Sequence, residues 1–204
     1  MDGSLYRWIN RLANRTHWAH GFFTAYANYG VVLFALLLLA AYLQGRQNGD
    51  LRVVAGAVWA AGSALVALGI GQLIGSAVDR ARPYATMPGV HVLVDKSTDF
   101  SFPSDHATVV GAVAAGLLLT NRRWGIIATV LAVLMAFTRV YVGAHYPGDV
   151  LAGLALGAAV AAAGRPVIVP ILTRIEAALA RTPARVLVSA PRSAPVVDRR
   201  SQES

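Results

Sequence analysis

The sequence predicts an all-α membrane protein, in which about five transmembrane helices form a polytopic bundle after an N-terminal interfacial helix. Hydrophobic residues make up 56% of the 204 residues and charged residues 14%, whereas an ordinary soluble domain has about 25% charged residues. Five long apolar stretches follow one another along the chain. Polar segments rich in arginine or in turn-forming residues separate them, as expected of loops between membrane helices.

The first element, residues 1–20, is expected to be an amphipathic helix that lies on the membrane surface. Its apolar and basic residues occupy separate helical faces, with Leu5, Trp8, Ile9 and Leu12 on one and Arg7, Arg11 and Arg15 on the other. This division is typical of interfacial helices. A signal peptide fits less well, because the apolar run that follows is long and no clear small-residue cleavage site comes after it.

The next elements are the membrane helices of one domain, residues 21–175. Their apolar stretches cover residues 22–43, 53–78, 107–120, 124–142 and 149–163, and the last has an apolar continuation towards Leu172. Crossing a bilayer takes about 20 residues, so the third helix must include the polar entry at residues 102–106. After Thr182 the chain is rich in Pro, Ser, Ala and Arg, and we expect residues 176–204 to form a basic, disordered tail.

The positions of the arginines predict the orientation of the bundle. One end of a five-helix bundle receives Arg46, Arg52, Arg122, Arg123 and all arginines from Arg165 onward. By the positive-inside rule this end faces the cytoplasm, and the loops 79–105 and 142–149 face the other side. The net charge of +8 is expected to orient the helices and to contact anionic membrane lipids rather than nucleic acid. The chain has no cysteine, which excludes disulfides and thiolate metal sites.

Three polar clusters interrupt the apolar chain, and the expected topology places all of them at the extracytoplasmic end. The clusters are DRARP with Arg80 and Arg82, FPSDH with Ser104, Asp105 and His106, and TRVYVGAHYPGD with Arg139, His145 and Asp149. Ionisable groups at membrane depth are costly and usually mark a functional site. Because the clusters lie at helix ends on one side, we expect their side chains to converge.

The residue types in these clusters favour chemistry on a phosphate group. Arginines offer planar, permanently charged donors that match tetrahedral oxyanions. The helix that opens at Ser104 presents free backbone N–H groups, which also favour an anion. Two histidines and an aspartate supply a nucleophile, a general acid and a carboxylate that fixes the tautomer of the nucleophile. This chemistry needs no metal ion and no other cofactor.

Each cluster also has a purely structural interpretation. Arg80 at a helix end can extend to the membrane interface. Ser104 or Asp105 can act as an N-cap, and this role is compatible with phosphate binding. His145 can be a hydrogen-bonded interfacial histidine. A zinc site built from the histidines and aspartates is a further alternative, although their spacing does not suggest one.

The order and spacing of these residues resemble the three-part signature of the type 2 phosphatidic acid phosphatase family, which also includes the vanadium haloperoxidases. The matching motifs are Arg82-Pro83, then Pro-Ser-x-His at residues 103–106, then Arg-x5-His-x3-Asp from Arg139 to Asp149. The resemblance implies that His145 is the nucleophile and forms a phosphohistidine. It also implies that Asp149 orients His145, that His106 is the general acid, and that the phosphate ligands are Arg82, Ser104 and Arg139.

The sequence departs from the family signature at three positions. Gly75 stands where the family usually has a lysine, Thr138 where serine is common, and Asp105 where glycine is common. The branch of bacterial undecaprenyl-diphosphatases linked to bacitracin resistance (BcrC-like) also tends to have the aspartate and to lack the lysine, and the resemblance to it covers about residues 5–160. We therefore place Asp105 in the phosphate site and expect Arg80 to supply the missing positive charge.

The resemblance implies an integral membrane phosphatase of the bacterial inner membrane, whose active site faces outside the cytoplasm. The implied substrate is undecaprenyl or another polyprenyl diphosphate, cleaved to the monophosphate, which recycles the lipid carrier of cell-wall synthesis. Phosphatidylglycerol phosphate and phosphatidic acid are alternative substrates. A catalytically silent lipid-binding or transport protein on the same scaffold is a further alternative, opposed by the intact set of His106, His145 and Asp149. The sequence does not predict an oligomeric state.

Overall fold

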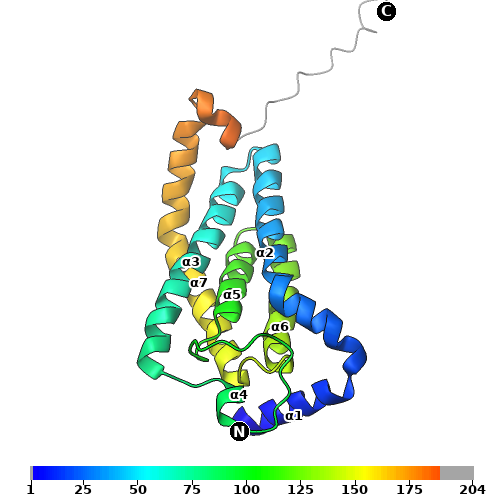
Figure 1. Ribbon diagram of the computed structural model, residues 1–204. Coiled ribbons are helices and arrows are strands. Elements are labelled where there is room, and N and C mark those ends of the chain that lie inside the picture. The colour runs from blue at the N-terminus through cyan, green and yellow to red at the C-terminus, as the bar shows by residue number, and fades with distance from the viewer. Residues whose placement is uncertain (1, 189–204) are drawn as a thin grey trace, which may run out of the picture.

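The computed structural model describes residues 2–188, and every regular element in this range is helical. Five long helices form the bundle: α2 (His20–Asn48), α3 (Leu51–Val78), α5 (Asp105–Leu118), α6 (Arg122–Tyr141) and α7 (Pro147–Leu179). The shorter elements are α1 (Asp2–Arg15), η1 (His17–Ala19), α4 (Pro83–Thr86) and η2 (Pro183–Leu187). In Figure 1, α1 and α4 lie at one end of the bundle, and the start of α3 and the end of α7 lie at the other.

The predicted all-α membrane bundle is confirmed, with one difference in its third membrane helix. Four segments are long and apolar enough to cross a membrane: His17–Asn48, Leu51–Thr86, Arg122–Tyr141 and Pro147–Leu179. The third apolar stretch forms α5, which has 14 residues and therefore extends about 21 Å, less than the roughly 30 Å of a hydrocarbon core. Residues 102–104 do not lengthen it, because Pro103 has no amide hydrogen and Ser104 has an extended backbone.

Helix α5 lies inside the bundle, where it packs against α3, α6 and α7 (Figure 1). Among its large apolar residues Leu118 at its end is exposed, whereas Val110, Val113 and Leu117 are buried. The contact with α7 is close enough to require glycine. A Cβ atom added at Gly157 would lie 2.1 Å from the carbonyl oxygen of Thr108. Small residues thus let the two backbones approach, as is common between membrane helices.

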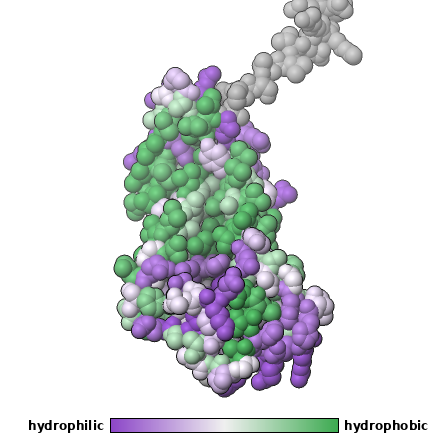
Figure 2. Space-filling view, viewed as in Figure 1, coloured by the Kyte–Doolittle hydropathy of each residue, from purple (hydrophilic) through white to green (hydrophobic). Residues whose placement is uncertain are grey.

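The outer surface of the bundle is apolar. Figure 2 shows a hydrophobic band over the middle of the molecule and polar residues concentrated at the end that carries α1. The exposed large apolar residues are spread over the long helices and include Leu36, Leu39, Leu65, Leu73, Val130, Val133 and Leu151. A surface of this kind is stable against lipid rather than water. The protein is therefore a multi-pass membrane protein.

Helix α1 forms as predicted, and it packs against the protein through a face that the sequence analysis did not single out. Leu5 and Trp8 are 48% and 58% exposed, and the residues that pack inward are Tyr6, Ile9, Asn10 and Ala13. Polar contacts help to hold this inward face in place. The Asn10 amide donates to the carbonyl of His91 at 2.7 Å and accepts from the N–H of the same residue at 2.9 Å. Helix α1 thus binds the loop before α5 and leaves Leu5 and Trp8 on the surface.

The C-terminal boundary extends beyond the predicted membrane domain. Helix α7 continues to Leu179, and the short helix η2 follows over Pro183–Leu187. The sequence analysis had ended the membrane domain at residue 175. The rest of the predicted basic tail, residues 189–204, lies outside the described residues.

Candidate active site

The three predicted polar clusters meet at the end of the bundle that carries α1 and α4 (Figure 1). Each comes from a different part of the chain: Arg80 and Arg82 from the segment between α3 and α4, residues 101–106 from the loop and first turn of α5, and Arg139, His145 and Asp149 from the end of α6, the following turn and the start of α7. Hydrogen bonds link all three segments. The predicted convergence is therefore present in the structure.

The imidazole of His145 is held in one tautomer by the loop before α5. Its Nδ1 lies 2.8 Å from the carbonyl oxygen of Ser101. Because a carbonyl oxygen can only accept, Nδ1 must carry the proton and Nε2 must present a lone pair. An Arg82 nitrogen, Nη1, lies 3.2 Å from Nε2 and donates to it. His145 is only 2% exposed, so this unprotonated nitrogen sits in a protected environment.

The surroundings of His145 keep the imidazole neutral. Burial lowers the pKa of His145 to about 4, and the positive charges of Arg139 and Arg82 act in the same direction. The neighbouring carboxylate of Asp149 and the carbonyl of Ser101 oppose this shift in the pKa without cancelling it. Desolvation disfavours the charged form of a buried base. At neutral pH the side chain is therefore an uncharged base with Nε2 available for attack.

Asp149 lies near His145 but does not contact it as the sequence analysis expected. The distance from Asp149 Oδ2 to His145 Nδ1 is 3.9 Å, too long for a hydrogen bond. The same oxygen accepts from the Ser101 hydroxyl at 2.6 Å and from the Tyr146 N–H at 2.9 Å. The carboxylate is fully buried. It thus holds the ring indirectly, by fixing Ser101, whose carbonyl binds Nδ1.

Arg80 is fully engaged by carboxylates. Nη1 donates to Asp149 Oδ1 at 2.6 Å, and Nη2 donates to Asp2 Oδ2 at 2.7 Å. The guanidinium also lies 4.0 Å from the centre of the Tyr146 ring. The structure thus places Arg80 in an ion-pair network, not in the position of a free phosphate ligand.

The position of the family lysine is tightly packed. A Cβ atom at Gly75 would lie 3.1 Å from the Phe102 carbonyl oxygen and 3.3 Å from the Phe100 ring. A side chain at residue 75 would therefore require the loop that leads into α5 to shift by a few tenths of an ångström. The glycine thus allows a close approach between α3 and this loop.

Ser104 and Arg139 form a contrasting region, because they contain buried polar atoms without partners. Within the described residues, Ser104 Oγ and Arg139 Nε are buried and make no hydrogen bond. Ser104 is fully buried and Arg139 is 7% exposed. Such atoms cost about 1–3 kcal/mol each unless something binds them. Helix α5 begins directly after Ser104 and adds unpaired N–H groups. Together with Arg82, this arrangement is suited to hold a phosphate.

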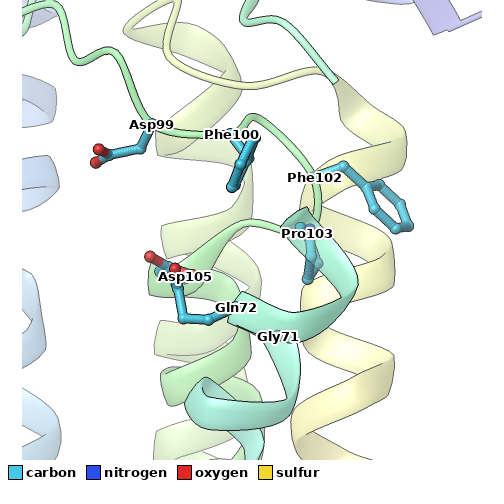
Figure 3. Close-up of a pocket in the computed structure, with 8 residues that line it drawn as sticks. Gly71, Gln72, Asp99, Phe100, Phe102, Pro103 and Asp105 are labelled. Carbon is cyan, nitrogen blue, oxygen red and sulfur yellow. Dashed lines mark hydrogen bonds between the residues drawn. The ribbon is translucent and has the colours of Figure 1, made fainter. Parts of the chain in front are cut away.

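His106 and Asp105 occupy the first turn of α5 beside this cradle. His106 lies within electrostatic range of Arg139, His145 and Arg82. The carboxylate of Asp105 is turned to α3, where Gln72 Nε2 donates to Oδ1 at 2.8 Å. Figure 3 shows this pair lining a small pocket below Asp99. The pocket has a volume of about 10 Å³, which is room for about one water molecule. An acidic side chain repels phosphate, so any contribution of Asp105 to phosphate binding comes from its backbone.

No group of three or more His, Cys, Asp or Glu side chains between residues 2 and 188 is arranged to hold a metal ion. The expectation that catalysis needs no metal or other cofactor stays a prediction, which a chelator experiment can test.

Three residues of the site escaped the sequence analysis: Asp2, Ser101 and Tyr146. Ser101 acts through its carbonyl as well as its hydroxyl, and backbone contacts leave no signal in a single sequence. Asp2 lies 78 residues before its partner Arg80. Tyr146 contributes its N–H to Asp149 and its ring to Arg80. Only the position of Ser101, next to the Pro-Ser-x-His motif, could have drawn attention to it.

Comparisons with known proteins agree with the geometry. The model of the PAP2 superfamily matches residues 56–170, a range that includes all three polar clusters. Undecaprenyl-diphosphatase BcrC of Bacillus subtilis (strain 168) is 31% identical and aligns over 76% of this chain and 77% of its own length. Decaprenylphosphoryl-5-phosphoribose phosphatase of Mycobacterium tuberculosis is 42% identical over 62% of this chain and 66% of its own.

A solved structure shares the fold. The crystal structure of a transmembrane PAP2 type phosphatidylglycerolphosphate phosphatase from Bacillus subtilis has a TM-score of 0.55 and covers 88% of each chain. The sequence identity is 21%, so this similarity concerns the arrangement of the helices alone.

Proposed function

The chain belongs to the PAP2 superfamily, and we propose that this membrane protein is a phosphatase that hydrolyses a polyprenyl diphosphate, such as undecaprenyl diphosphate, to the monophosphate. One observation carries the proposal: the unprotonated Nε2 of buried His145 shares a site with the unpartnered donors of Ser104 and Arg139. A nucleophile beside an anion cradle is what phosphoryl transfer to an enzyme requires. The similarity to BcrC supports the choice of lipid diphosphate.

In the first step, His145 attacks the terminal phosphate. Arg82, Ser104 and Arg139 hold its oxygens, and their donors stabilise the charge that develops in the transition state. A bond forms between Nε2 and phosphorus while the bond from phosphorus to the bridging oxygen breaks. His106, which takes up a proton when the negatively charged diphosphate binds beside it, gives that proton to the bridging oxygen, and the polyprenyl monophosphate leaves. Ser101 keeps the proton on Nδ1 throughout, so the attacking nitrogen stays unprotonated.

In the second step, water hydrolyses the phosphohistidine. The water oxygen bonds to phosphorus, the bond between Nε2 and phosphorus breaks, and His106 accepts the proton of the water. Inorganic phosphate leaves and the neutral imidazole of His145 is restored. The low pKa of His145, about 4 in the free enzyme, favours this step, because a weakly basic nitrogen is a good leaving group.

A diphosphate is favoured over a monophosphate ester by the chemistry of the leaving group. Cleaving the anhydride releases a phosphate monoester, which leaves more readily than the alkoxide released from phosphatidic acid. The alternative substrates are phosphatidylglycerol phosphate and phosphatidic acid. The test is to purify the protein, supply all three lipids side by side and measure inorganic phosphate, with the His145→Ala variant as the blank. Fastest release from undecaprenyl diphosphate is expected; release from phosphatidic acid alone would overturn the substrate assignment.

The same preparation tests the absence of a cofactor. We expect EDTA to leave turnover intact, because Arg82, Arg139 and the start of α5 supply the positive charge that metals supply in other phosphoryl-transfer sites. Vanadate should inhibit, because it can form a trigonal bipyramidal adduct with Nε2 of His145. Loss of activity in EDTA that one metal restores would contradict this mechanism.

We also propose that the active site faces outside the cytoplasm of a bacterial cell. The arginine-rich segments at Arg46, Arg52, Arg122 and Arg123 lie at the opposite end of the helices, which supports this orientation by the positive-inside rule. The chain has no cysteine, so a thiol reagent can label only a cysteine that is introduced by mutation. A membrane-impermeant thiol reagent applied to intact cells should label Thr98→Cys, at an exposed position near the site, and spare Gln47→Cys, exposed at the other end. Labelling of Gln47→Cys alone would invert the topology.

A further inference from the structure

We propose that Asp2 of the N-terminal helix α1 is a positioning residue of the active site, which holds Arg80 against Asp149 and fixes the turn that carries His145. Asp2 precedes every motif of the site, and the family match begins only at residue 56. The inference deepens the proposed function and rests on His145 being the nucleophile of that reaction.

The carboxylate of Asp2 joins two segments that are distant in sequence. Oδ2 accepts from Arg80 Nη2 at 2.7 Å, and Oδ1 accepts from the backbone N–H of Gly148 at 2.8 Å. Gly148 lies in the first turn of α7, where backbone N–H groups have no partner within the helix. Asp2 therefore caps α7 from a different helix, and its negative charge lies at the positive end of the helix dipole.

A continuous series of short contacts runs from Asp2 to the nucleophile. The guanidinium of Arg80 binds Asp2 through Nη2, and its Nη1 donates to Asp149 Oδ1 at 2.6 Å. The other oxygen of Asp149 accepts from the Ser101 hydroxyl at 2.6 Å, and the carbonyl of Ser101 accepts from His145 Nδ1 at 2.8 Å. Three of the five groups in this series, Asp149, Ser101 and His145, are buried, so water does not compete for their contacts.

Helix α1 also contacts the turn between α6 and α7 on both sides of His145. Before it, the Tyr6 hydroxyl donates to the carbonyl of Gly143 at 3.3 Å. After it, Asp2 binds Gly148, and the rings of Tyr6 and Tyr146 lie 5.5 Å apart. Tyr6 is fully buried. These contacts distinguish α1 from a helix that only lies on the membrane, because its inner face contacts the turn between α6 and α7.

A surface ion pair is the alternative interpretation of Asp2 and Arg80. Their side chains are 32% and 31% exposed, and isolated pairs of this kind contribute little. The difference here is the network: both halves of the Arg80 guanidinium are bound, and its second partner Asp149 is completely buried. Charge-assisted hydrogen bonds that share a buried member reinforce one another. Without Asp2, Nη2 of Arg80 would lose its carboxylate partner, and Arg80 would be held against Asp149 by one nitrogen only.

The test compares Asp2→Asn and Asp2→Ala with Asp50→Asn in purified protein. Asp50 is a matched control, because it also caps a helix, accepting from the N–H groups of Arg52 and Val53 at the start of α3, at the opposite end of the bundle. We expect the Asp2 variants to lower kcat about threefold to tenfold with KM within about twofold, the signature of a contact that acts on the transition state. Asp50→Asn keeps a capping oxygen at the start of α3 and should leave kcat unchanged.

A double-mutant cycle shows whether Asp2 acts through Arg80. In an Arg80→Gln background, Asp2→Asn should change kcat by less than about twofold, because coupled residues are not additive. Fully additive losses, or equal kcat for Asp2→Asn and the wild type, would overturn the proposal. A lower KM for Asp2→Asn would also overturn it, because it would mean that Arg80 is released to bind substrate.

A substrate-free measurement separates this inference from the proposed function. Diethyl pyrocarbonate modifies neutral imidazoles, and mass spectrometry can follow its addition to His145. We expect faster modification of His145 in Asp2→Asn than in the wild type or Asp50→Asn, because the turn is less firmly held. If no lipid diphosphate is hydrolysed, the proposed function fails while this result stands. If the wild type is active and the modification rate does not change, the role of Asp2 fails alone.

Discussion

The site contains two regions with the same residue types and opposite states of hydrogen bonding. Around Asp149, the polar groups are paired: the carboxylate accepts hydrogen bonds from Arg80, the Ser101 hydroxyl and the Tyr146 N–H. Around Ser104, the serine Oγ and the Nε of Arg139 are buried without a partner in the part of the chain that the structure describes. We call these the closed network and the open cradle. The matched region holds His145, the proposed nucleophile, in place, whereas the unmatched one offers free donors to a ligand.

Three arginines mark the boundary between the two regions. Arg80 belongs wholly to the closed network, and Arg139 contributes its buried Nε to the open cradle. Arg82 contacts the carbonyls of Asp99 and Ala144 and also reaches Nε2 of His145. The difference teaches that an arginine near a phosphate site is not by that fact a phosphate ligand. Whether it can bind the phosphate depends on which protein groups already bind its guanidinium.

The largest effect is expected where the two regions meet, at His145. Replacement by alanine removes the nucleophile and should lower phosphate release about 1,000-fold or more. His17→Ala is the matched control, because His17 lies in the short helix η1 outside the site, and it should retain nearly full turnover. If His145→Ala keeps more than about a tenth of the activity, its barrier has risen by less than about 1.4 kcal/mol. That result would show that another group attacks.

Arg139→Gln and Arg80→Gln test the division into cradle and network directly. Loss of a donor aimed at the transition state typically costs about 100-fold to 1,000-fold, so Arg139→Gln should lower kcat by about that factor and raise the inhibition constant of vanadate. Arg80→Gln should lower kcat about tenfold and leave the vanadate constant nearly unchanged, because Arg80 contacts carboxylates and reaches the phosphate only through positioning. The reverse order of vanadate constants would exchange the two assignments.

The acid limb of the pH profile tests the electrostatics of the network. An imidazole with an ordinary pKa of about 6.5 loses its nucleophilic form below that pH, whereas the pKa of His145 is lowered to about 4. The neutral form therefore persists as the pH falls from 6.5 to about 4. At pH 5 the neutral fraction should be about 30-fold larger than for an unshifted histidine, and kcat/KM reports this ionisation in the free enzyme.

The substrate also titrates near neutral pH, so its own ionisation must be measured by ³¹P NMR and divided out. A remaining acid limb near pH 6.5 would contradict the lowered pKa of His145. Arg82→Gln should move the limb upward, because the charge of Arg82 contributes to the shift in the pKa.

Much of the fold and the cradle was accessible from the sequence, because each depends on local patterns. Apolar stretches of about 20 residues identified the long helices, and the spacing from Arg139 to Asp149 placed a donor, the nucleophile and a carboxylate on one turn. The length of α5 was less accessible, since it depends on the conformation of Pro103 and Ser104 before the helix. The burial of α5 inside the bundle is a property of three other helices and leaves little trace in its own sequence.

The closed network was mostly hidden from the sequence. Asp149 was expected to orient the His145 ring by direct contact, and Arg80 was expected to supply positive charge to the phosphate site. In the structure they face each other, because Asp2 and Ser101 supply the remaining partners. A carboxylate and a backbone carbonyl that arrive from distant segments are not encoded by spacing. Only the folded arrangement shows which charge is already neutralised.

Ser101 offers the smallest and most specific test of the comparison. Ser101→Ala removes the hydroxyl that donates to Asp149 Oδ2 but keeps the carbonyl that binds Nδ1 of His145. Asp149 retains Arg80 and the Tyr146 N–H, so we expect a loss in kcat of only about threefold to fivefold, within the worth of one hydrogen bond to a charged group. Ser97→Ala is the control, because the Ser97 hydroxyl serves only the N–H of Asp99 in the same loop. Equal kcat for both variants, at equal unfolding temperature, would mean that the carbonyl alone holds the nucleophile and that Asp149 acts on it by charge and not through Ser101.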